Sequence, residues 1–361
     1  MQRIYVDNNA TTPVHPDVLR VVSESLATVF GNASSIHKEG QTARRAIEEA
    51  RESVARLLGA AGRDVVFTSG GTESNNAAIF GAMAGAHGQH VVTTAIEHPS
   101  VLEAVSRFDA TYVAPSRDGL IDVSAMIGAL RDDTRLVAMM LANNETGVIQ
   151  PVAEVARVCR ARGIHVHCDA VQAAGKIDVD VEQLGVDTLA VSAHKLNAPK
   201  GIGALWVRRG LALAPHVVGG AQERRRRAGT ENVPLAAAFG AAAALPRADV
   251  APLRDRLEAG LEAVIINGAG VARLPNTSSV TFPDADAEGI VIGLDLNGIA
   301  ASTGSACSSG RVEPSRVLLA MGLTPDEAKS TVRFSFGRFN TVDEVEHLLD
   351  VLGEVVPRCR N

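Results

Sequence analysis

Lys195 stands in the segment SAHKLNAPKG, directly after the apolar run DTLAV. Such a run is typical of a buried strand, so an amine just beyond it is partly removed from water. Desolvation or a nearby cation lowers the pKa of an amine and frees it to form a Schiff base. Most lysines are solvated surface groups, and Lys200 in the same segment is an alternative. The segment therefore indicates a covalent-binding lysine, with Lys195 as the first choice.

The glycine-rich segment TSGGTESNN could bind a phosphate. Gly70 and Gly71 let the backbone approach a ligand, and a helix begins at Thr72 with Glu73 in its first turn. Free N–H groups at the start of a helix attract anions. The pattern is neither GxGxxG nor a Walker loop, so it does not indicate a nucleotide. The alternative is an ordinary turn from strand to helix.

Titratable side chains alternate in the segment HVHCDAVQ. Because side chains of a strand alternate between faces, His165, His167 and Asp169 share one face and Cys168 points to the other. This argues against a zinc site, which needs histidine and cysteine to converge. A carboxylate at a strand end suits a protonated pyridine nitrogen. The alternative is that Asp169 caps a following helix.

Three further segments carry polar candidates. His98 in AIEHPS could stack on a flat cofactor and move protons, although capping or core histidines are commoner. Asn143 and Asn144 in NNETG could be turn residues or ligands. The arginine run 224–227 could meet an anionic partner, but a solvated loop or subunit contact is the commoner role, and Thr230 nearby is a candidate phosphate ligand.

Cys307 lies in STGSACSSG, a segment of small residues. Such a loop costs little to order, so it could carry a thiol between two positions, and we expect it to be mobile. The other cysteines are Cys159, Cys168 and Cys359, and no CxxC pair occurs. We expect no disulfides, and we expect these three thiols to be dispensable for turnover.

Helical and strand patterns alternate along the first two thirds of the chain. Apolar periodicity predicts helices in HPDVLRVVSESLATVF and QTARRAIEEARESVARLLG, the second with a glycine cap at Gly59. Short apolar runs predict the strands in DVVFT, HVVTTA, RLVAMML, IHVHCDA, DTLAVSAHK and GIGALWVRRG. This is typical of an α/β fold whose mainly parallel sheet is covered by helices on both faces. Ligands bind beyond the carboxyl ends of such strands, where the candidates above lie.

The pattern changes near Pro246. A helix predicted from about Arg254 to Ile265 and the runs SSVTFP, EGIVIGLDLNG and STVRFSFGRF indicate a smaller α+β unit. We predict a large domain over residues 14–246. The small domain would combine residues 1–13 with residues 247–361.

Composition narrows the class of protein. The 361 residues are 46% hydrophobic and 21% charged with a net charge of −6, as in a globular protein with a large core. Mild acidity and only 3% aromatic residues disfavour a nucleic-acid partner. There is neither a long apolar run for a membrane span nor a signal-peptide core, so we expect a cytoplasmic protein.

A phosphate cradle, a partner for a pyridine nitrogen, a Schiff-base lysine and a stacking ring together are what pyridoxal phosphate requires. The chain also resembles the class I cysteine desulfurases related to NifS and IscS. The resemblance runs from about residue 4 to 350 through these motifs in order: YVDNNATTP, FGNASSIH, FTSGGTESNN, EHPSV, NNETGV, CDAVQAAGK, SAHK, RRAGTEN, STGSACSSG and VRFSFGRF.

The resemblance implies a pyridoxal-phosphate-dependent transferase of fold type I, aminotransferase class V. Its mainly parallel, mixed seven-stranded sheet would be accompanied by a smaller α+β domain with the cysteine loop at about 301–313. The implied cofactor-binding residues are Gly71, Thr72, His98, Asn144, Asp169, Gln172, Ser192, His194, Lys195 and Thr230. Lys195 would bind the cofactor covalently, and Thr230 would reach it from the second subunit of a homodimer.

The implied reaction converts L-cysteine to L-alanine and leaves the sulfur as a persulfide on Cys307. Lys195, His98 and Cys307 would be catalytic, with Asn32, Asn144 and Arg333 binding the substrate. Arg333 would grip its carboxylate. The acceptor would be an iron–sulfur scaffold or a thiolation protein. No resident metal is expected, although Cys307 could contact a cluster on that partner.

Three departures and two alternatives accompany the resemblance. Ala198 replaces a usual glycine, the run 224–227 is unusually basic, and docking of a scaffold through a helical C-terminal tail is not expected. A selenocysteine lyase or a class V aminotransferase would have the same fold. The thiol of Cys307 argues against an aminotransferase, which needs no such group.

Overall fold

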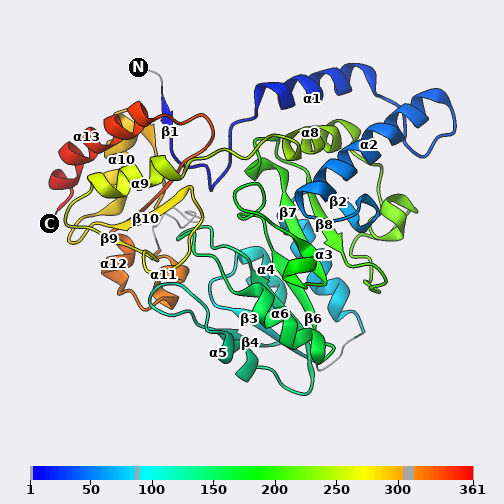
Figure 1. Cartoon of the computed structure of the whole chain (residues 1–361), viewed down its shortest axis with the longest axis horizontal. Coiled ribbons are helices and arrows are strands. Elements are labelled where there is room, and N and C mark those ends of the chain that lie inside the picture. Colours follow the sequence, from blue (N-terminus) through cyan, green and yellow to red (C-terminus); the bar gives the residue numbers. More distant parts are fainter. Residues whose placement is uncertain (1–2, 86–88, 304–312, 361) are drawn as a thin grey trace.

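A mixed seven-stranded sheet runs through the larger part of the molecule (Figure 1). The computed structural model describes residues 3–85, 89–303 and 313–360. The strands, in their order across the sheet, are β2 (Val65–Thr68), β8 (Gly203–Val207), β7 (Thr188–Ser192), β6 (His165–Asp169), β5 (Thr134–Met140), β3 (His90–Thr94) and β4 (Asp109–Val113). Strand β8 is antiparallel to both β2 and β7, and the other neighbouring strands of this sheet pair in parallel. The mainly parallel, mixed sheet predicted from the sequence is confirmed.

Helices cover both faces of this sheet (Figure 1). In this region they are α1 (Pro16–Thr28), α2 (Lys38–Leu57), α3 (Gly71–Met83), α4 (Pro99–Val105), α5 (Val123–Gly128), α6 (Val152–Ala161), α7 (Val181–Leu184) and α8 (Val233–Ala243). One face packs against α2, α6 and α8 in a large apolar cluster. The other face packs against α3 and α4. Burial on both faces explains the uninterrupted apolar runs in these strands.

Within the main sheet, β4 is the strand that the apolar runs of the sequence do not predict. Its sequence, DATYV, lies at the edge of the sheet, and only Val113 at its end is buried. Because an edge strand is half exposed, it lacks the continuous Val/Ile/Leu pattern that marks the central strands.

The C-terminal third forms a second group of elements with its own apolar cluster. These are β9 (Ile265–Ile266), β10 (Thr277–Thr281) and β12 (Thr331–Ser335) in an antiparallel sheet, β11 (Ile299–Ala300), and the helices α9 (Ala251–Gly260), α10 (Ala287–Leu296) and α13 (Val342–Arg358). The N-terminal strand β1 (Ile4–Tyr5) pairs with β11 and adds Ile4 and Val6 to that cluster.

Two short helices of the same third, α11 (Arg316–Ala320) and α12 (Pro325–Lys329), pack elsewhere. Val317, Leu318 and Ala328 belong to the large cluster of the main sheet. The division into residues 14–246 and residues 1–13 with 247–361 therefore stays a prediction.

The helix predicted from about Arg254 to Ile265 is displaced in the structure. Helix α9 begins at Ala251, because Pro252 is tolerated in the first turn of a helix, and it ends at Gly260. Ile265 and Ile266 instead pair with Thr281 and Val280 of β10. Tertiary pairing overrides the local helical pattern at this end.

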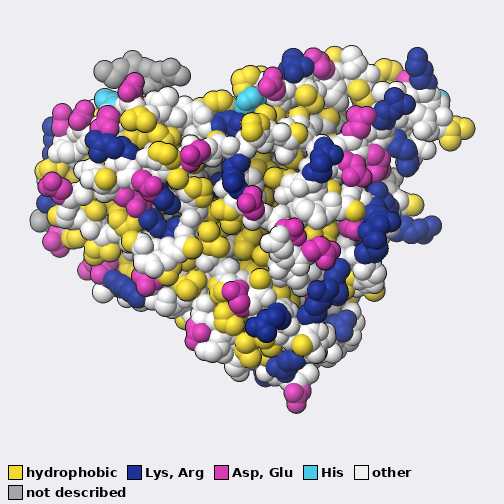
Figure 2. All heavy atoms as spheres, viewed as in Figure 1, with side chains coloured by type: hydrophobic (Ala, Val, Ile, Leu, Met, Phe, Trp, Pro, Cys, Tyr) yellow, Lys and Arg dark blue, Asp and Glu magenta, His cyan; other side chains and the backbone are white. Residues whose placement is uncertain are grey.

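Figure 2 shows one face of the molecule, and lysine and arginine side chains gather along its right-hand edge.

In the described part of the chain, no helix combines the length and apolarity needed to cross a membrane.

A buried ion pair ties α2 to the connection that contains the arginine run. Arg51 and Glu223 are 3% and 6% exposed, and their side chains form two hydrogen bonds of 2.6 and 3.0 Å. Arg51 Nη1 also donates to the carbonyl oxygen of Val65, and the Phe67 N–H donates to Glu223. Glu223 adopts a left-handed backbone, with φ of 45°. The pair thus fixes the 222–231 connection against β2.

We expect Arg51→Met to lower the free energy of unfolding by about 3–5 kcal/mol, because it leaves the Glu223 carboxylate buried without its cation. Arg20→Met, which removes an exposed arginine from α1, is the matched control and should change stability little. Urea unfolding at one protein concentration measures both. Equal losses in the two variants would contradict a structural role for the buried pair.

Candidate active site

The predicted functional residues follow the carboxyl ends of parallel strands at one edge of the main sheet. Asp169 ends β6, and Lys195 lies in the short 3-10 turn η2 (Ala193–Lys195) directly after β7. His98 follows β3 and caps the start of α4, and Asn144 follows β5. Chain connectivity therefore brings these side chains to the same edge.

Lys195 is a half-buried amine held by two backbone carbonyls. Its Nζ donates to the carbonyl oxygens of Asn9 and Ala10. Burial, followed by the charge of Arg333, lowers the pKa of Lys195 to about 8, while Asp7 and Asp169 oppose this change. About a tenth of the amine is therefore unprotonated at pH 7, far more than for a lysine in water, as a nucleophile or base requires.

The alternative lysine, Lys200, is exposed to solvent. Ala198, which replaces the usual glycine, is buried and packs in the large apolar cluster. The structure therefore favours Lys195 as the reactive amine, and the extra methyl group of Ala198 is accommodated by packing.

Asn9 is a central residue of the site that was not singled out from the sequence. It is 1% exposed, and its carbonyl oxygen accepts from both Lys195 and Gln172 Nε2. Its side chain donates to the Asn144 carbonyl oxygen and accepts from Lys176. The only sequence signal was its place in the motif YVDNNATTP, just after an apolar pair.

Lys176 is a second amine beside Lys195 that sequence reasoning also missed. Its Nζ donates to Gln172 Oε1 at 2.7 Å and to Asn9 Oδ1 at 2.8 Å. Burial, then the charges of Lys195 and Arg333, lower the pKa of Lys176 well below its usual value. Its contact orients the Gln172 amide, since Oε1 is occupied and Nε2 must donate.

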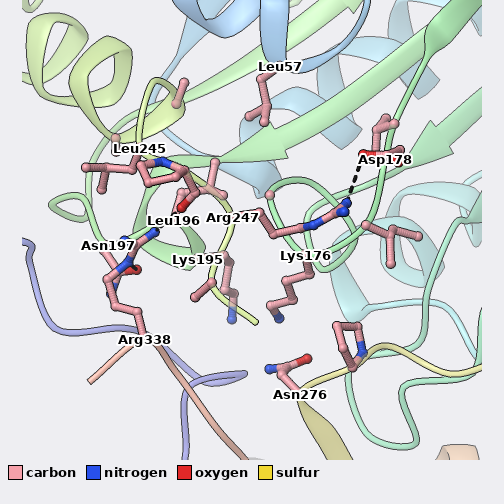
Figure 3. A pocket seen from close by; sticks show the side chains of 18 of the residues that line it. Leu57, Lys176, Asp178, Lys195, Leu196, Asn197, Leu245, Arg247, Asn276 and Arg338 are labelled. Carbon is pink, nitrogen blue, oxygen red and sulfur yellow. Dashed lines mark hydrogen bonds and ion pairs between the residues drawn. The ribbon is translucent and has the colours of Figure 1, made fainter. Parts of the chain in front are cut away.

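A cavity of about 700 Å³ borders both amines (Figure 3). In Figure 3, Lys176 and Lys195 point toward the same part of this cavity, opposite Asn276. Arg338 and Arg247 lie on other walls, and Arg247 pairs with Asp178. The two amines thus border both this cavity and the carboxyl ends of the strands, where Asp169 lies.

Asp169 is a buried carboxylate with one hydrogen bond recorded to each oxygen. Its Oδ1 accepts from the Val171 N–H at 2.9 Å and its Oδ2 from Asn75 Nδ2 at 2.7 Å. A turn follows Asp169 rather than the helix considered from the sequence, so Asp169 caps a turn. Each carboxylate oxygen keeps a further lone pair for a ligand.

His98 combines solvent access with a lowered pKa. Its side chain is exposed, yet enough protein surrounds it that burial lowers the pKa, with Asp169 acting against this and Lys195 adding to it. Its Nδ1 accepts from the Ser100 N–H at 3.1 Å and contacts Ser100 Oγ at 2.8 Å. The ring therefore caps α4 through Nδ1, which leaves Nε2 as the nitrogen that does not take part in this cap.

The glycine-rich turn forms an open cradle at the start of α3. Gly70 precedes the helix, no side chain caps it, and an added Cβ there would meet no atom. Gly71 lies against Val171 and Ser192, since an added Cβ would come within 2.8 and 3.6 Å of their side chains. Unpaired N–H groups in the first turn of the helix attract an anion such as a phosphate.

His194, directly before Lys195 in η2, is neutral near pH 7. Its Nδ1 contacts Thr11 Oγ1 at 3.2 Å. Burial, then the charges of Lys195 and Lys200, lower the pKa of His194 to about 4. It is thus suited to hydrogen bonding rather than to carrying a charge.

Arg333 in β12 is buried opposite Lys195. Its Nη2 donates to Asp7 at 2.7 Å and its Nη1 to the Asn144 carbonyl oxygen at 3.0 Å. Its Nε is buried without a hydrogen-bond partner in the described part of the chain. The guanidinium therefore retains a donor for an anionic ligand.

Two predicted residues lie away from this group. Asn32 is exposed in the connection between α1 and α2 and accepts from the Ser34 N–H. Thr230 is also exposed, but its connection is tied to the phosphate cradle because Arg227 pairs with Glu73 in the first turn of α3.

Cys307 lies outside the described residues. The other thiols have raised pKa values because of burial: about 11 for Cys159, well above the usual value for Cys168, and raised for Cys359. Protonated thiols are poor nucleophiles. The described residues contain no group of three or more His, Cys, Asp or Glu side chains that could hold a metal ion.

These groups match the chemistry of pyridoxal phosphate. The open turn at Gly70 suits its phosphate, the amine of Lys195 suits its aldehyde, and the carboxylate of Asp169 suits its pyridine nitrogen. An α/β fold with this set at the carboxyl ends of its strands is suited to an enzyme that uses such a cofactor.

Comparisons with known proteins support an enzyme of this class. The family described as Aminotransferase class-V matches residues 4–348. A cysteine desulfurase of Nostoc sp. is 44% identical over 377 aligned positions, covering 100% of this chain and 94% of the relative. A solved NifS-like protein superposes with a TM-score of 0.91 at 34% identity, covering 99% and 100% of the two chains. The structure titled SspA in complex with cysteine gives 0.86 at 35% identity, covering 94% and 100%.

The chain belongs to the aminotransferase class-V family and, within it, to the cysteine desulfurases.

The effect of burial on a carboxyl group near this site can be tested at Glu97. It is 3% exposed, its Oε1 accepts from Thr94 and the Met140 N–H, and its Oε2 has no partner among the described residues. Burial, with a contribution from Asp169, raises the pKa of Glu97 from 4.5 to about 8. The folded protein therefore holds Glu97 protonated near neutral pH.

The unfolded chain ionises Glu97 above pH 4.5, so between 4.5 and about 8 the folded state binds more protons. The free energy of unfolding should fall as pH rises through this window, by about 1.4 kcal/mol per pH unit. Glu97→Gln should flatten this fall, and Glu103→Gln, at an exposed position of α4, should not. Denaturant unfolding across pH measures this, and parallel profiles for wild type and Glu97→Gln would contradict it.

Proposed function

We propose that this protein removes sulfur from L-cysteine, releases L-alanine and carries the sulfur as a persulfide on Cys307. One observation carries the proposal: the amine of Lys195, with a pKa of about 8, stands within electrostatic reach of Asp169 and Arg333. The family supports it, as does a structure of a similar protein that is titled as a complex with cysteine.

Pyridoxal phosphate, bound through Lys195, would supply an electron sink that allows a proton to leave the α-carbon of an amino acid. Asp169 would hold the proton on its pyridine nitrogen, and Gln172 Nε2 would donate to its phenolic oxygen. His98 and Asn144 would contact the ring. The residues proposed to bind its phosphate are Gly71, Thr72, Ser192, His194 and, from a second subunit, Thr230.

Residues of the candidate active site would bind and deprotonate the substrate. Arg333 Nε, buried and unpartnered in the described part, would bind the substrate carboxylate, with Asn144 and Asn32 completing the site. The freed Lys195 Nζ would take the α-proton, because its lowered pKa allows it to accept one near neutral pH. His98 would exchange a proton with the substrate sulfur.

Sulfur transfer balances without an external oxidant. The substrate Cβ–Sγ bond breaks, an S–S bond forms to the Cys307 sulfur, and the carbon that loses sulfur gains hydrogen to become alanine. The thiol of Cys307 is thereby oxidised to a persulfide as the substrate carbon is reduced. A thiol reductant then releases the outer sulfur as sulfide.

Both flanks of the Cys307 segment are anchored beside the site. Ser302 pairs with the Arg333 backbone, and Ser315 Oγ donates to Glu145 next to Asn144. Five fully extended residues span at most about 18 Å, so the Cα of Cys307 cannot lie farther than that from the Cα of Ser302. This tether supports Cys307 as the sulfur acceptor.

The persulfide would pass to a partner protein, such as an iron–sulfur scaffold or a thiolation enzyme. A thiol that must remain reduced to accept sulfur suits the cytoplasm, where we place the protein.

Incubation of the purified protein with L-cysteine and a reductant should yield L-alanine and sulfide in equal amounts. Absence of alanine would overturn the proposal, and pyruvate-linked amino transfer instead would indicate an aminotransferase. A large preference for selenocysteine over cysteine would indicate a selenocysteine lyase.

Cys307→Ser should retain the yellow, cofactor-bound protein and lose sulfide release, whereas Cys359→Ser should keep both. Lys195→Ala should lose the covalently held cofactor. Full activity of Cys307→Ser would contradict the persulfide assignment while leaving the cofactor assignment standing.

We also propose that the protein is a homodimer. Phe30 and Ile36, in the connection between α1 and α2, are 81% and 93% exposed, and Val218 is 79% exposed. Large apolar side chains exposed to this degree favour a subunit contact. Thr230 lies on an exposed connection that Arg227 ties to the cradle, as a residue shared between subunits requires.

The double variant Phe30→Asp with Ile36→Asp should shift the sedimentation coefficient from dimer toward monomer and weaken cofactor retention. Leu296→Asp, at an equally exposed leucine of α10, is the matched control and should leave the dimer intact. A wild-type protein that sediments as a monomer at micromolar concentration would overturn this part of the proposal.

A further inference from the structure

Asn75, in the first half of α3, lies at the centre of a buried hydrogen-bond network behind the site. It is 1% exposed, and its amide makes three contacts. Nδ2 donates to Asp169 Oδ2 at 2.7 Å and to Ser100 Oγ at 2.9 Å, and Oδ1 lies 2.9 Å from His167 Nε2. Because a carboxylate only accepts, the contact with Asp169 fixes which end of the amide carries its hydrogens.

The direction of the hydrogen bonds at His98 is fixed independently. The Ser100 backbone N–H, which can only donate, points to His98 Nδ1 at 3.1 Å. Nδ1 therefore carries a lone pair, and the Ser100 hydroxyl, 2.8 Å away, must donate to it as well. That hydroxyl then accepts from Asn75, in agreement with the amide orientation set by Asp169.

The contact between Asn75 and His167 is consistent with the same orientation of the Asn75 amide. His167 is fully buried, and burial lowers its pKa to about 3, so the ring is neutral. Its Nε2 donates to Asn75 Oδ1, and its Nδ1 accepts from the Thr188 hydroxyl at 3.0 Å. Each of these hydrogen bonds thus pairs a donor with an acceptor, and reversing the amide would place its oxygen against the Asp169 carboxylate.

We propose that Asn75 and Ser100 are positioning residues that hold His98 as the neutral ring protonated at Nε2. The proposal rests on the proposed function only for the roles of His98 and Asp169. Because an amide does not pass protons along, the network orients the ring without forming a proton wire. His98 therefore exchanges protons through Nε2 alone, on its solvent-accessible side, and it begins the reaction as an N–H donor toward the substrate sulfur.

The same amide ties His98 to Asp169. One Asn75 side chain donates to both the Asp169 carboxylate and the Ser100 hydroxyl, so Asp169 and His98, the two residues proposed to contact the cofactor ring, would share a support. The charged groups that act on His98 are Asp169 and Lys195, which oppose each other. Hydrogen bonding, rather than a net charge, therefore selects the tautomer.

Nitrogen NMR of the holoenzyme labelled with ¹⁵N-histidine tests this directly, with His98→Gln to assign the His98 signals. Near neutral pH we expect a protonated Nε2 and an unprotonated, hydrogen-bonded Nδ1. A proton on Nδ1, on both nitrogens, or in rapid exchange between them would overturn the proposal.

Asn75→Asp tests the positioning role with a side chain of the same shape. The new carboxylate oxygen cannot donate to Ser100 Oγ, so the Ser100 hydroxyl should turn toward it and leave His98 Nδ1. The new carboxyl group also lies against the Asp169 carboxylate, so the two share one proton and no net charge is added beside His98. The His98 tautomers should then mix. Asn297→Asp, the same exchange at an exposed residue that follows α10, is the control and should leave the wild-type tautomer.

An unchanged His98 spectrum in Asn75→Asp, or an equal change in Asn297→Asp, would overturn the positioning role. If Asn75→Asp does not fold, Ser100→Ala serves, since it keeps the backbone donor and removes the hydroxyl. It should shift the Nδ1 resonance toward that of a more weakly bonded nitrogen. Because these spectra are recorded without substrate, they are independent of alanine formation, which alone tests the proposed function.

Discussion

The desolvated amine of Lys195 is the constraint on which the site depends. An amine in water is protonated near neutral pH and cannot attack a carbonyl, whereas burial and the charge of Arg333 bring its pKa to about 8. The nearby anions do not cancel this effect, because Asp7 pairs with Arg333 and Asp169 is engaged by hydrogen bonds. Neutral carbonyl groups of Asn9 and Ala10 hold the amine instead.

Neutral polar groups do most of the positioning around that amine. Asn9, Gln172 and Asn75 connect strand ends to the N-terminal segment, to Lys176 and to α3. Amides suit this role because they supply both donors and acceptors without a charge that would disturb the pKa of Lys195. A buried network of this kind is stable only when each member has a partner, which makes its geometry specific.

Much of the candidate site could be predicted because its residues stand at recognisable places in the chain. Lys195, Asp169 and His98 each follow an apolar run, and such runs mark buried strands. Asn9, Lys176 and Asn75 were missed, since asparagines and a lysine near turns and helix starts look like ordinary surface residues. Glu97 was missed because its neighbour His98 carried the obvious chemistry.

The sequence by itself determined the alternation of strands and helices and the polar residues at the strand ends, because apolar periodicity and turn residues are local properties. Only the tertiary structure decided which polar atoms meet. Arg333 pairs with Asp7, 326 positions away, and Asn75 meets Asp169, 94 positions away. Such contacts depend on how the sheets and helices pack. The same packing removed water from Lys195 and placed Ile265, the last residue of a predicted helix, in a strand with Ile266.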